Sequence, residues 1–249
     1  MNTASQTLAK ETADRLGLPF VVRGNSSVEA LMEQYEVPAV MVAKKQALTL
    51  VTSGGELFFH SSMAHLRIKN LRMGKKDNML EAMGLEAGMR VLDCTLGFGA
   101  DALVASYAAG AEGKVTGLES SPLIAAVVGY GMQHLMAENY DIHEAMRRIT
   151  VYNRNYLDYL KQQPAGSVDI VYFDPMFRHP LRASTNLDPL RSVANPSPVS
   201  EEAVEEACRV ARYRVVLKEN SRSLEFARLG FTHVMGGRYS RVHYGVMTV

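Results

Sequence analysis

The stretch RVLDCTLGFGADALVA, residues 90–105, is the part of the sequence that predicts the fold. It begins as an apolar run typical of a buried strand, which delivers Asp93 to its end, and it closes with a pattern typical of a helix. Gly97 and Gly99 lie between the two and allow the backbone to turn tightly and to approach a ligand closely. Because ligands of open α/β sheets bind where the carboxyl ends of the strands meet, the stretch predicts a ligand site at that edge.

From Asn78 onward, strand and helix patterns alternate as they do in a parallel sheet with helices on both faces. The predicted strands are 90–94, 114–118, 149–153, 168–173 and 213–217, and the predicted helices are 100–109, 122–138, 156–162 and 200–211. Two further strands at 231–235 and 242–248 predict an antiparallel hairpin, which is how the common methyltransferase sheet ends. The predicted fold class is therefore α/β, with a doubly wound, mostly parallel, Rossmann-like sheet.

The residues before Asn78 have a different character, which predicts two units, residues 1–77 and 78–249. Two short amphipathic helices (7–16 and 27–35) and three short strands (39–43, 47–52 and 56–59) predict a small α+β subdomain. The run from His60 to Lys76 follows, and it has no acidic residue. Its Lys and Arg residues are Arg67, Lys69, Arg72, Lys75 and Lys76. Such a run is either a solvated linker or a patch that contacts phosphates.

Composition limits the classes of function. The 249 residues include 27 Lys and Arg against 26 Asp and Glu, so the formal net charge is only +1. This excludes a protein that coats nucleic acid by charge alone, and any nucleic-acid contact is expected to be a local patch. We expect a cytoplasmic protein with no membrane partner, because no run approaches the roughly 18 apolar residues of a membrane span and the first ten residues lack a signal-peptide centre. Without Cys or His residues at metal-ligand spacing, no metal is expected.

The glycine pattern alone leaves two cofactor classes open. Gly97, Gly99 and Ala102 satisfy the G-x-G-x-x-G/A pattern of dinucleotide sites, and Glu119 stands at about the spacing of a ribose-binding acid. A nicotinamide dinucleotide and S-adenosylmethionine both carry an adenosine whose ribose hydroxyls bind a carboxylate. Asp93 and Glu119 therefore do not distinguish a dehydrogenase from a methyltransferase.

The stretch VDIVYFDPMF, residues 168–177, favours the methyltransferase. Its end, Asp174-Pro175-Met176-Phe177, looks like a variant of the [D/N]-P-P-[Y/F] motif of methyltransferases that modify exocyclic amino groups. Such an amine is a poor nucleophile, and a carboxylate that accepts its N–H groups favours a more reactive, pyramidal nitrogen. Pro175 would fix the adjacent carbonyl and Phe177 would stack on the target base. The alternative is a simple turn, since Asp-Pro is common in loops.

Other positions are weaker candidates. Ser120 would contact the cofactor beside Glu119, and Asn155 with Tyr156 would either hold the adenine or cap the following helix. Lys218 is either an RNA phosphate contact or a surface lysine. The segment from Arg178 to Ser200, rich in Pro, Asn and Ser, is interpreted as a substrate lid.

The sequence resembles the bacterial small-subunit (16S) ribosomal RNA guanine-N2 methyltransferases of the YhiQ type. The matching segments are MAHLR (63–67), DCTLGFGAD (93–101), LESSP (118–122), YFDPMF (172–177) and RVVLK (214–218). The resemblance implies a class I methyltransferase whose cofactor site uses Ala100 and Asp101, Glu119 and Ser120, Asn155 and Tyr156, and Asp174.

The resulting hypothesis is an S-adenosylmethionine-dependent enzyme that methylates a guanine N2 amine in ribosomal RNA, with the base swung out of its stack. Candidate RNA contacts are His65, Arg67, Lys69 and Lys218. The alternatives are methylation of another amine, such as adenine N6 or a small molecule, and a non-catalytic module that binds RNA or the cofactor.

Overall fold

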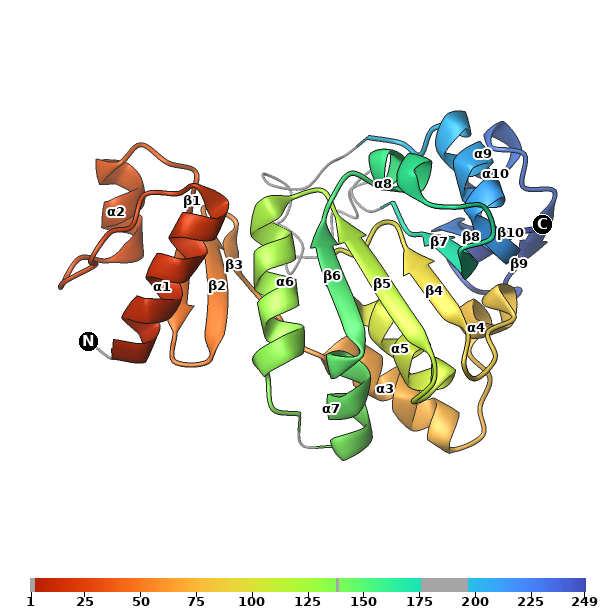
Figure 1. The fold of residues 1–249 in the computed structure, drawn as a ribbon, viewed down its shortest axis with the longest axis horizontal. Helices are drawn as coiled ribbons and strands as arrows, with labels where there is room; N and C mark the ends of the chain where they lie inside the picture. The colour runs from red at the N-terminus through yellow and green to blue at the C-terminus, as the bar shows by residue number, and fades with distance from the viewer. Residues whose placement is uncertain (1–2, 138, 176–196) are drawn as a thin grey trace.

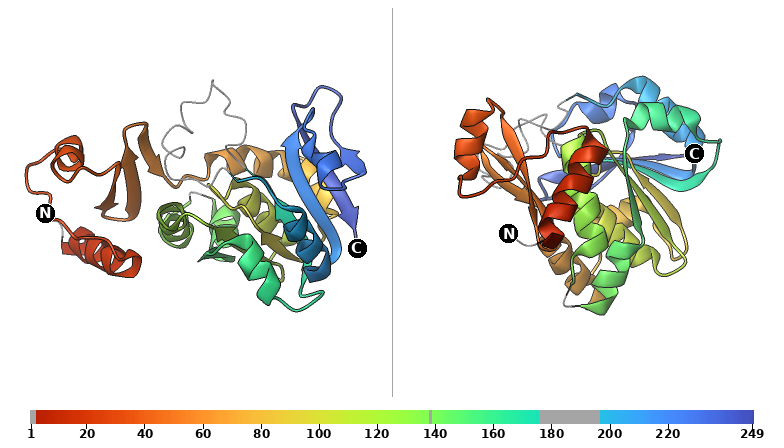
Figure 2. Two further views of the ribbon diagram at one scale, coloured as in Figure 1. Left: turned by 90° about the horizontal axis from the view of Figure 1, so that it is seen from above. Right: turned by 60° about the vertical axis from the view of Figure 1, so that its left-hand side comes forward.

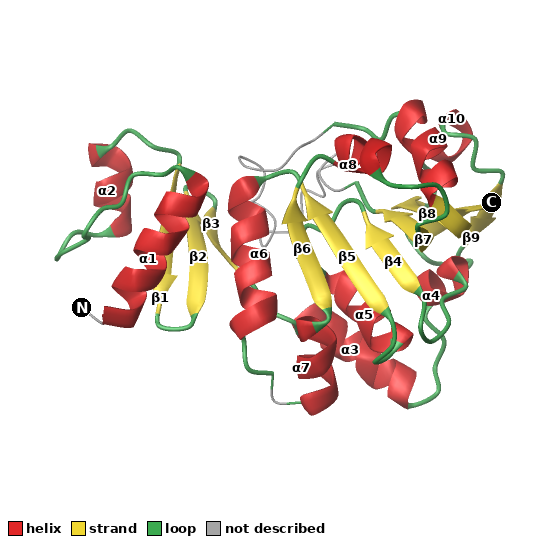
Figure 3. Cartoon of the chain, in the orientation of Figure 1, coloured by secondary structure: helices red, strands yellow, loops and turns green. Residues whose placement is uncertain are grey.

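The computed structural model describes residues 3–137, 139–175 and 197–249. It contains a three-stranded sheet near the N-terminus and a seven-stranded sheet in the rest of the chain (Figures 1 and 3). The first part consists of α1 (Thr3–Leu16), α2 (Val28–Gln34), β1 (Ala39–Lys44), β2 (Ala47–Thr52) and β3 (Gly55–Phe58). These strands pair antiparallel in the order β1-β2-β3, as expected for strands joined by short turns.

The seven-stranded sheet has the order β6-β5-β4-β7-β8-β10-β9. Its strands are β4 (Arg90–Asp93), β5 (Lys114–Glu119), β6 (Ile149–Asn153), β7 (Val168–Phe173), β8 (Ala211–Asn220), β9 (His233–Met235) and β10 (Val242–Thr248). Strands β4 to β8 are parallel, and β10 runs antiparallel to both β8 and β9. The predicted fold class is confirmed. The strand order reverses between β4 and β7, and in such sheets ligands bind at the reversal.

Helices cover both faces of this sheet (Figure 2). They are α3 (Ser62–Arg72), α4 (Asn78–Met83), α5 (Ala100–Ala109), α6 (Pro122–His134), α7 (Tyr140–Arg147), α8 (Tyr156–Gln162), α9 (Glu201–Val210) and α10 (Glu225–Arg228). Strand β7 shows why both faces are covered. Ile170 and Tyr172 pack in a core shared with α3 to α7, and Val171 and Phe173 pack in a second core with α8 to α10. Its apolar run from Ile170 to Phe173 is typical of a strand buried on both faces.

Helix α6 lies between the two sheets and joins their cores (Figure 1). Leu50 and Leu57 of the small sheet belong to the same apolar cluster as Val127 and Met132 of α6. The contact is tight at Gly131, where an added Cβ atom would lie 2.3 Å from the Cβ of Phe59. The division of the chain into residues 1–77 and 78–249 stays a prediction.

Most of the basic run forms helix α3 instead of an extended linker, and a phosphate contact by its side chains stays a prediction. Ala64 and Ile68 are fully buried one turn apart on α3, and the helix packs against α5. The short helices α4, α7 and α10 were not predicted, and the helix predicted over 122–138 ends at His134. The proposed lid lies almost entirely outside the described residues. Within the described ranges no helix is long and apolar enough to cross a membrane.

Candidate functional site

Three acidic residues lie at the carboxyl ends of adjacent parallel strands. Asp93 ends β4, Glu119 ends β5 and Asp174 follows β7, the other neighbour of β4. Asp93 and Glu119 are only 2% and 8% exposed. Carboxylates are rarely buried this deeply unless they have partners or a function, so their partners decide what the site can do.

The glycine loop between β4 and α5 brings backbone N–H groups to this edge. Gly97 and Gly99 have φ values of 49° and 72°, in the left-handed region that favours glycine. The Gly97 N–H donates to Oε2 of Glu119 at 3.1 Å. Gly99 is the N-cap of α5, and Ala100 is the first residue of that helix. The loop therefore has the closely approachable backbone that its sequence predicts.

Glu119 is fixed by the backbone on both sides. Its Oε1 accepts from the Ser121 N–H at 2.8 Å and its Oε2 accepts from Gly97. Burial raises the pKa of this carboxyl, and the two backbone hydrogen bonds oppose the rise. Asn153, which the sequence analysis did not single out, holds the same turn by donating to the carbonyls of Glu119 and Ser120 at 2.8 and 3.0 Å. The two carboxylate oxygens of Glu119 each accept one backbone N–H, from Ser121 and from Gly97. Each oxygen keeps a lone pair for a ligand hydroxyl.

A network of charges lies next to the glycine loop. Asp101, in the first turn of α5, accepts at Oδ2 from the Tyr172 hydroxyl at 2.7 Å and from Nζ of Lys218 at 2.8 Å. Its Oδ1 accepts from Arg67, which is also paired with Asp77 at 2.7 Å. Nζ of Lys218 donates in addition to Oδ2 of Asp174 at 2.7 Å. The network thus links α3, α5, β7 and β8 at one point.

The two carboxylates that share Lys218 have opposite pKa shifts. Burial opposes ionisation of Asp101, but the charges of Lys218 and Arg67 outweigh it and lower its pKa. Burial raises the pKa of Asp174, and Lys218 only partly opposes the rise. Desolvation likewise raises the pKa of Asp93 well above its ordinary value. Asp174 is therefore the member of the pair that takes up a proton first as the pH falls.

The backbone after β7 is fixed as well. The Asp174 N–H donates to Oγ1 of Thr95 at 2.5 Å, which ties the Asp-Pro step to the glycine loop. Pro175 directly follows, and Phe177 lies outside the described residues. Thr95 holds the backbone of Asp174, and the Tyr172 hydroxyl holds Asp101. Neither residue was predicted from the sequence to be part of the site. Tyr172 gave no signal because it stands inside the apolar run 170–173 of β7.

The remaining predicted residues have varied surroundings. Oδ1 of Asn155 caps α8 by accepting from the N–H groups of Leu157 and Asp158, and the Tyr156 ring packs edge-on against Phe173. His65 lies 3.1 Å from the Ser61 hydroxyl through Nε2. Lys69 is exposed and forms no ion pair within the described part of the chain. RNA contacts stay predictions for all four candidates, which are His65, Arg67, Lys69 and Lys218. No group of three or more potential metal ligands occurs in the described ranges.

Comparison with known proteins agrees with this geometry. Residues 19–243 match the family described as "Putative SAM-dependent methyltransferase", so the chain belongs to the S-adenosylmethionine-dependent methyltransferases. The cofactor that the sequence predicts is thereby confirmed. The fold agrees too: a solved SAM-dependent methyltransferase, NGO1261 from Neisseria gonorrhoeae, superposes with a TM-score of 0.68 at 18% identity, over 99% of this chain and 93% of that one.

Two curated relatives extend the comparison. "Uncharacterized protein YpiP" of Bacillus subtilis (strain 168) is 39% identical over 239 residues, which are 96% of this chain and 93% of the relative. "Ribosomal RNA small subunit methyltransferase J" of Pseudomonas fluorescens (strain Pf0-1) is 25% identical over 86% of this chain and 92% of its own. The resemblance inferred from the motifs is confirmed by these matches.

Proposed function

We propose that the protein transfers a methyl group from S-adenosylmethionine to the exocyclic N2 amine of a guanine in small-subunit ribosomal RNA. The observation that carries the proposal is the Asp174 carboxylate, held by Lys218 beside the glycine loop and followed by Pro175. This is the arrangement that an amine-orienting group needs. Several relatives are named as ribosomal RNA small subunit methyltransferases, which supports ribosomal RNA as the substrate.

The residues at the strand ends fit the cofactor. Glu119 would bind the ribose hydroxyls, since both its oxygens are fixed by backbone N–H groups and keep lone pairs. The bound cofactor supplies an electrophilic methyl group. The other residues proposed to line its site are Asp93, Gly97, Gly99, Ala100, Asp101, Ser120, Asn155, Tyr156 and Asp174. Asp101 contributes through the network that holds Asp174, because its two oxygens already accept from Arg67, Tyr172 and Lys218.

Catalysis would depend on positioning, with no covalent intermediate. Asp174 and the Pro175 carbonyl would accept the N–H groups of the amine, which would direct the nitrogen lone pair at the methyl carbon. As the N–C bond forms, the methyl–sulfur bond breaks, and the proton that the nitrogen loses would pass to Asp174 or to solvent. Phe177 stacks on the base after the base leaves its helix. A charged Asp174 is the better acceptor, and Lys218 favours that charged form.

The decisive experiment is transfer of labelled methyl groups to ribosomal RNA from a strain that lacks this gene. We expect wild-type protein and Asp14→Asn, a change of an exposed carboxylate on α1, to label the RNA. Asp174→Asn should label the RNA at least about 100-fold more slowly, which is the usual effect of removing a positioned side chain that accepts a proton or N–H group of the reacting atom. Equal labelling by Asp174→Asn would disprove the role of Asp174.

Mass analysis of the labelled nucleosides tests the target atom. N2-methylguanosine is the expected product. Label only in N6-methyladenosine, or only in a small molecule, would establish the alternative amine substrates. Tight RNA binding without transfer to any substrate would establish a binding module instead.

A further inference from the structure

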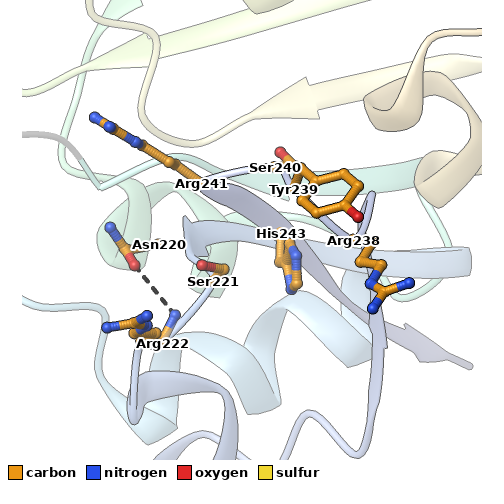
Figure 4. A pocket seen from close by; sticks show the side chains of 8 residues that line it. All are labelled: Asn220, Ser221, Arg222, Arg238, Tyr239, Ser240, Arg241 and His243. Carbon is orange, nitrogen blue, oxygen red and sulfur yellow. Dashed lines mark hydrogen bonds between the residues drawn. The ribbon is translucent and has the colours of Figure 1, made fainter.

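A basic pocket of about 630 Å³ lies beside the end of β8, apart from the carboxylates described above (Figure 4). Asn220 and Arg222 line it where the chain leaves β8. Arg238, Tyr239 and Arg241 come from the connection between β9 and β10, and His243 comes from β10 itself. Among the described residues, no acidic side chain lines the pocket.

Its three arginines carry uncompensated charge. Arg222, Arg238 and Arg241 are exposed, and none of their guanidinium groups forms an ion pair within the described residues. Other arginines differ: Arg67 and Arg228, for example, are held by carboxylates. Three unpaired charges in one pocket exceed the formal net charge of the whole chain, which is +1. The pocket is therefore a local attractive site for a polyanion on a nearly neutral protein.

The arrangement suits an extended strand better than one small anion. In Figure 4, Arg222 and Arg241 point to one side of Ser221 and His243, whereas Arg238 and Tyr239 lie on the other. Donors that are spread in this way can meet successive phosphates. The Tyr239 ring is 89% exposed, with the guanidinium carbon of Arg238 5.6 Å from the ring centroid. An exposed aromatic ring among cations is a stacking surface for an unpaired base.

The pocket shares a sheet edge with the carboxylate site. Asn220 is two residues beyond Lys218 on β8, and Nζ of Lys218 is bonded to Asp174. Strands β7 and β8 are parallel, so both sites lie at carboxyl ends of neighbouring strands. A nucleic-acid strand held at the pocket is thus well placed to present a nearby nucleotide to Asp174.

We propose that this pocket binds the phosphates of a single-stranded RNA segment next to the target nucleotide, with Tyr239 stacking on one of its bases. The inference rests on the proposed function in that the substrate is RNA. It adds a site on the β9–β10 connection that the sequence did not indicate.

The test is binding of a fluorescent single-stranded RNA of about twelve nucleotides, with S-adenosylhomocysteine present and no methyl transfer required. The triple variant Arg222→Ala, Arg238→Ala, Arg241→Ala should bind the RNA at least about tenfold more weakly. In a plot of log affinity against log salt concentration, the slope of this variant should be smaller in magnitude by about 2, because each lost phosphate contact removes roughly 0.7. Tyr239→Ala should lose about fivefold or more with the slope unchanged.

A matched control removes the same charge elsewhere. Arg15, Lys45 and Lys114 are exposed, form no ion pair within the described residues, and lie on α1, the β1–β2 turn and the start of β5. Their triple alanine variant should keep most of the affinity and the slope. Thermal melting and cofactor titration of all variants confirm that each is folded.

The outcomes separate the two proposals. Unchanged affinity and slope in the arginine variant, equal losses in both triple variants, or no RNA binding by the wild type overturns the inference. Binding that depends on the arginines, together with no methyl transfer to RNA by the wild type, overturns the proposed function and supports the pocket.

Discussion

Nζ of Lys218 lies 2.7 Å from Oδ2 of Asp174, and the same ammonium lies 2.8 Å from Asp101. One cation is therefore shared by two carboxylates. Asp101 has Arg67 and the Tyr172 hydroxyl as further donors, whereas Lys218 is the side-chain donor to Asp174 within the described residues. Replacement of Lys218 should consequently affect the ionisation of Asp174 more than that of Asp101.

The variant Lys218→Met should shift the acid limb of the kcat/KM profile to higher pH. Lys218 lowers the pKa of Asp174 against the effect of burial, so its loss raises that pKa and protonates the carboxylate at a less acidic pH. Rates measured between about pH 5 and 9 would show the shift. Lys218→Arg, which keeps the charge, should return the acid limb most of the way to its wild-type pH. Lys69→Met, a change of an exposed lysine on α3, should leave the acid limb in place. An unmoved acid limb in Lys218→Met contradicts the assignment.

The variant Tyr172→Phe should lower the free energy of unfolding by about 1.5–3 kcal/mol, the usual range for a hydrogen bond to a charged group. Tyr172 is 1% exposed and its hydroxyl donates to Asp101 at 2.7 Å. Urea denaturation at neutral pH is the measurement. Tyr213→Phe, on the exposed part of β8, is the control and should change stability by less than about 0.5 kcal/mol. Equal effects of the two changes would show that the Tyr172 hydroxyl contributes little.

Much of the fold follows from local pattern in the sequence. The apolar runs of β4, β5 and β7 are largely buried and bounded by polar residues, so their positions could be predicted closely. Helix α3 was harder, because its buried residues, Ala64 and Ile68, stand among basic side chains that resemble a linker. The short helices α4 and α10 have too few turns to give a periodic signal.

The candidate site was partly predictable for a related reason. Asp93, Glu119 and Asp174 each follow a predicted strand, and parallel strands end at one edge, so their proximity could be inferred. The ion pairs could not be. Arg67 meets Asp101 across 34 positions and Lys218 meets it across 117, and no local pattern specifies such partners. Sequence therefore predicted the acids of the site better than the cations that hold them.

The variants Asn155→Ala and Asn155→Ser separate the two interpretations of this residue. Its Oδ1 caps α8, so Asn155→Ala should cost about 1 kcal/mol of stability, and Asn155→Ser should recover most of it because serine also caps helices. If the amide also holds the adenine, as proposed, both variants should bind S-adenosylmethionine severalfold more weakly. Denaturation and calorimetric titration measure the two effects. If Asn155→Ser binds the cofactor with wild-type affinity, Asn155 only caps α8 and does not hold the adenine.

The variant Glu119→Gln should weaken S-adenosylmethionine binding by at least about tenfold, which corresponds to roughly 1.4 kcal/mol. An amide presents one acceptor oxygen, so it cannot accept from both Gly97 and Ser121 and still receive a ribose hydroxyl. Glu112→Gln, on the exposed loop before β5, is the control and should bind normally. Calorimetric titration gives both affinities. Wild-type affinity in Glu119→Gln would place the ribose elsewhere.

The variants Gly131→Ala and Gly129→Ala test the junction between the small sheet and α6. Both glycines lie on α6, where alanine alone would gain up to about 1 kcal/mol from helix propensity. A Cβ atom at Gly129 would meet Val151 at an ordinary 3.5 Å, whereas one at Gly131 would lie 2.3 Å from the Cβ of Phe59. Gly129→Ala should therefore keep or raise stability, and Gly131→Ala should lose about 1–3 kcal/mol by overpacking. Adding Phe59→Gly, which removes both the Cβ atom and the ring, should relieve the clash, so that the cost of Gly131→Ala becomes smaller in that background. Denaturation of the four proteins gives this coupling. Independent effects of the two changes would mean that α6 and Phe59, the residue after β3, are not packed against each other in solution as they are here.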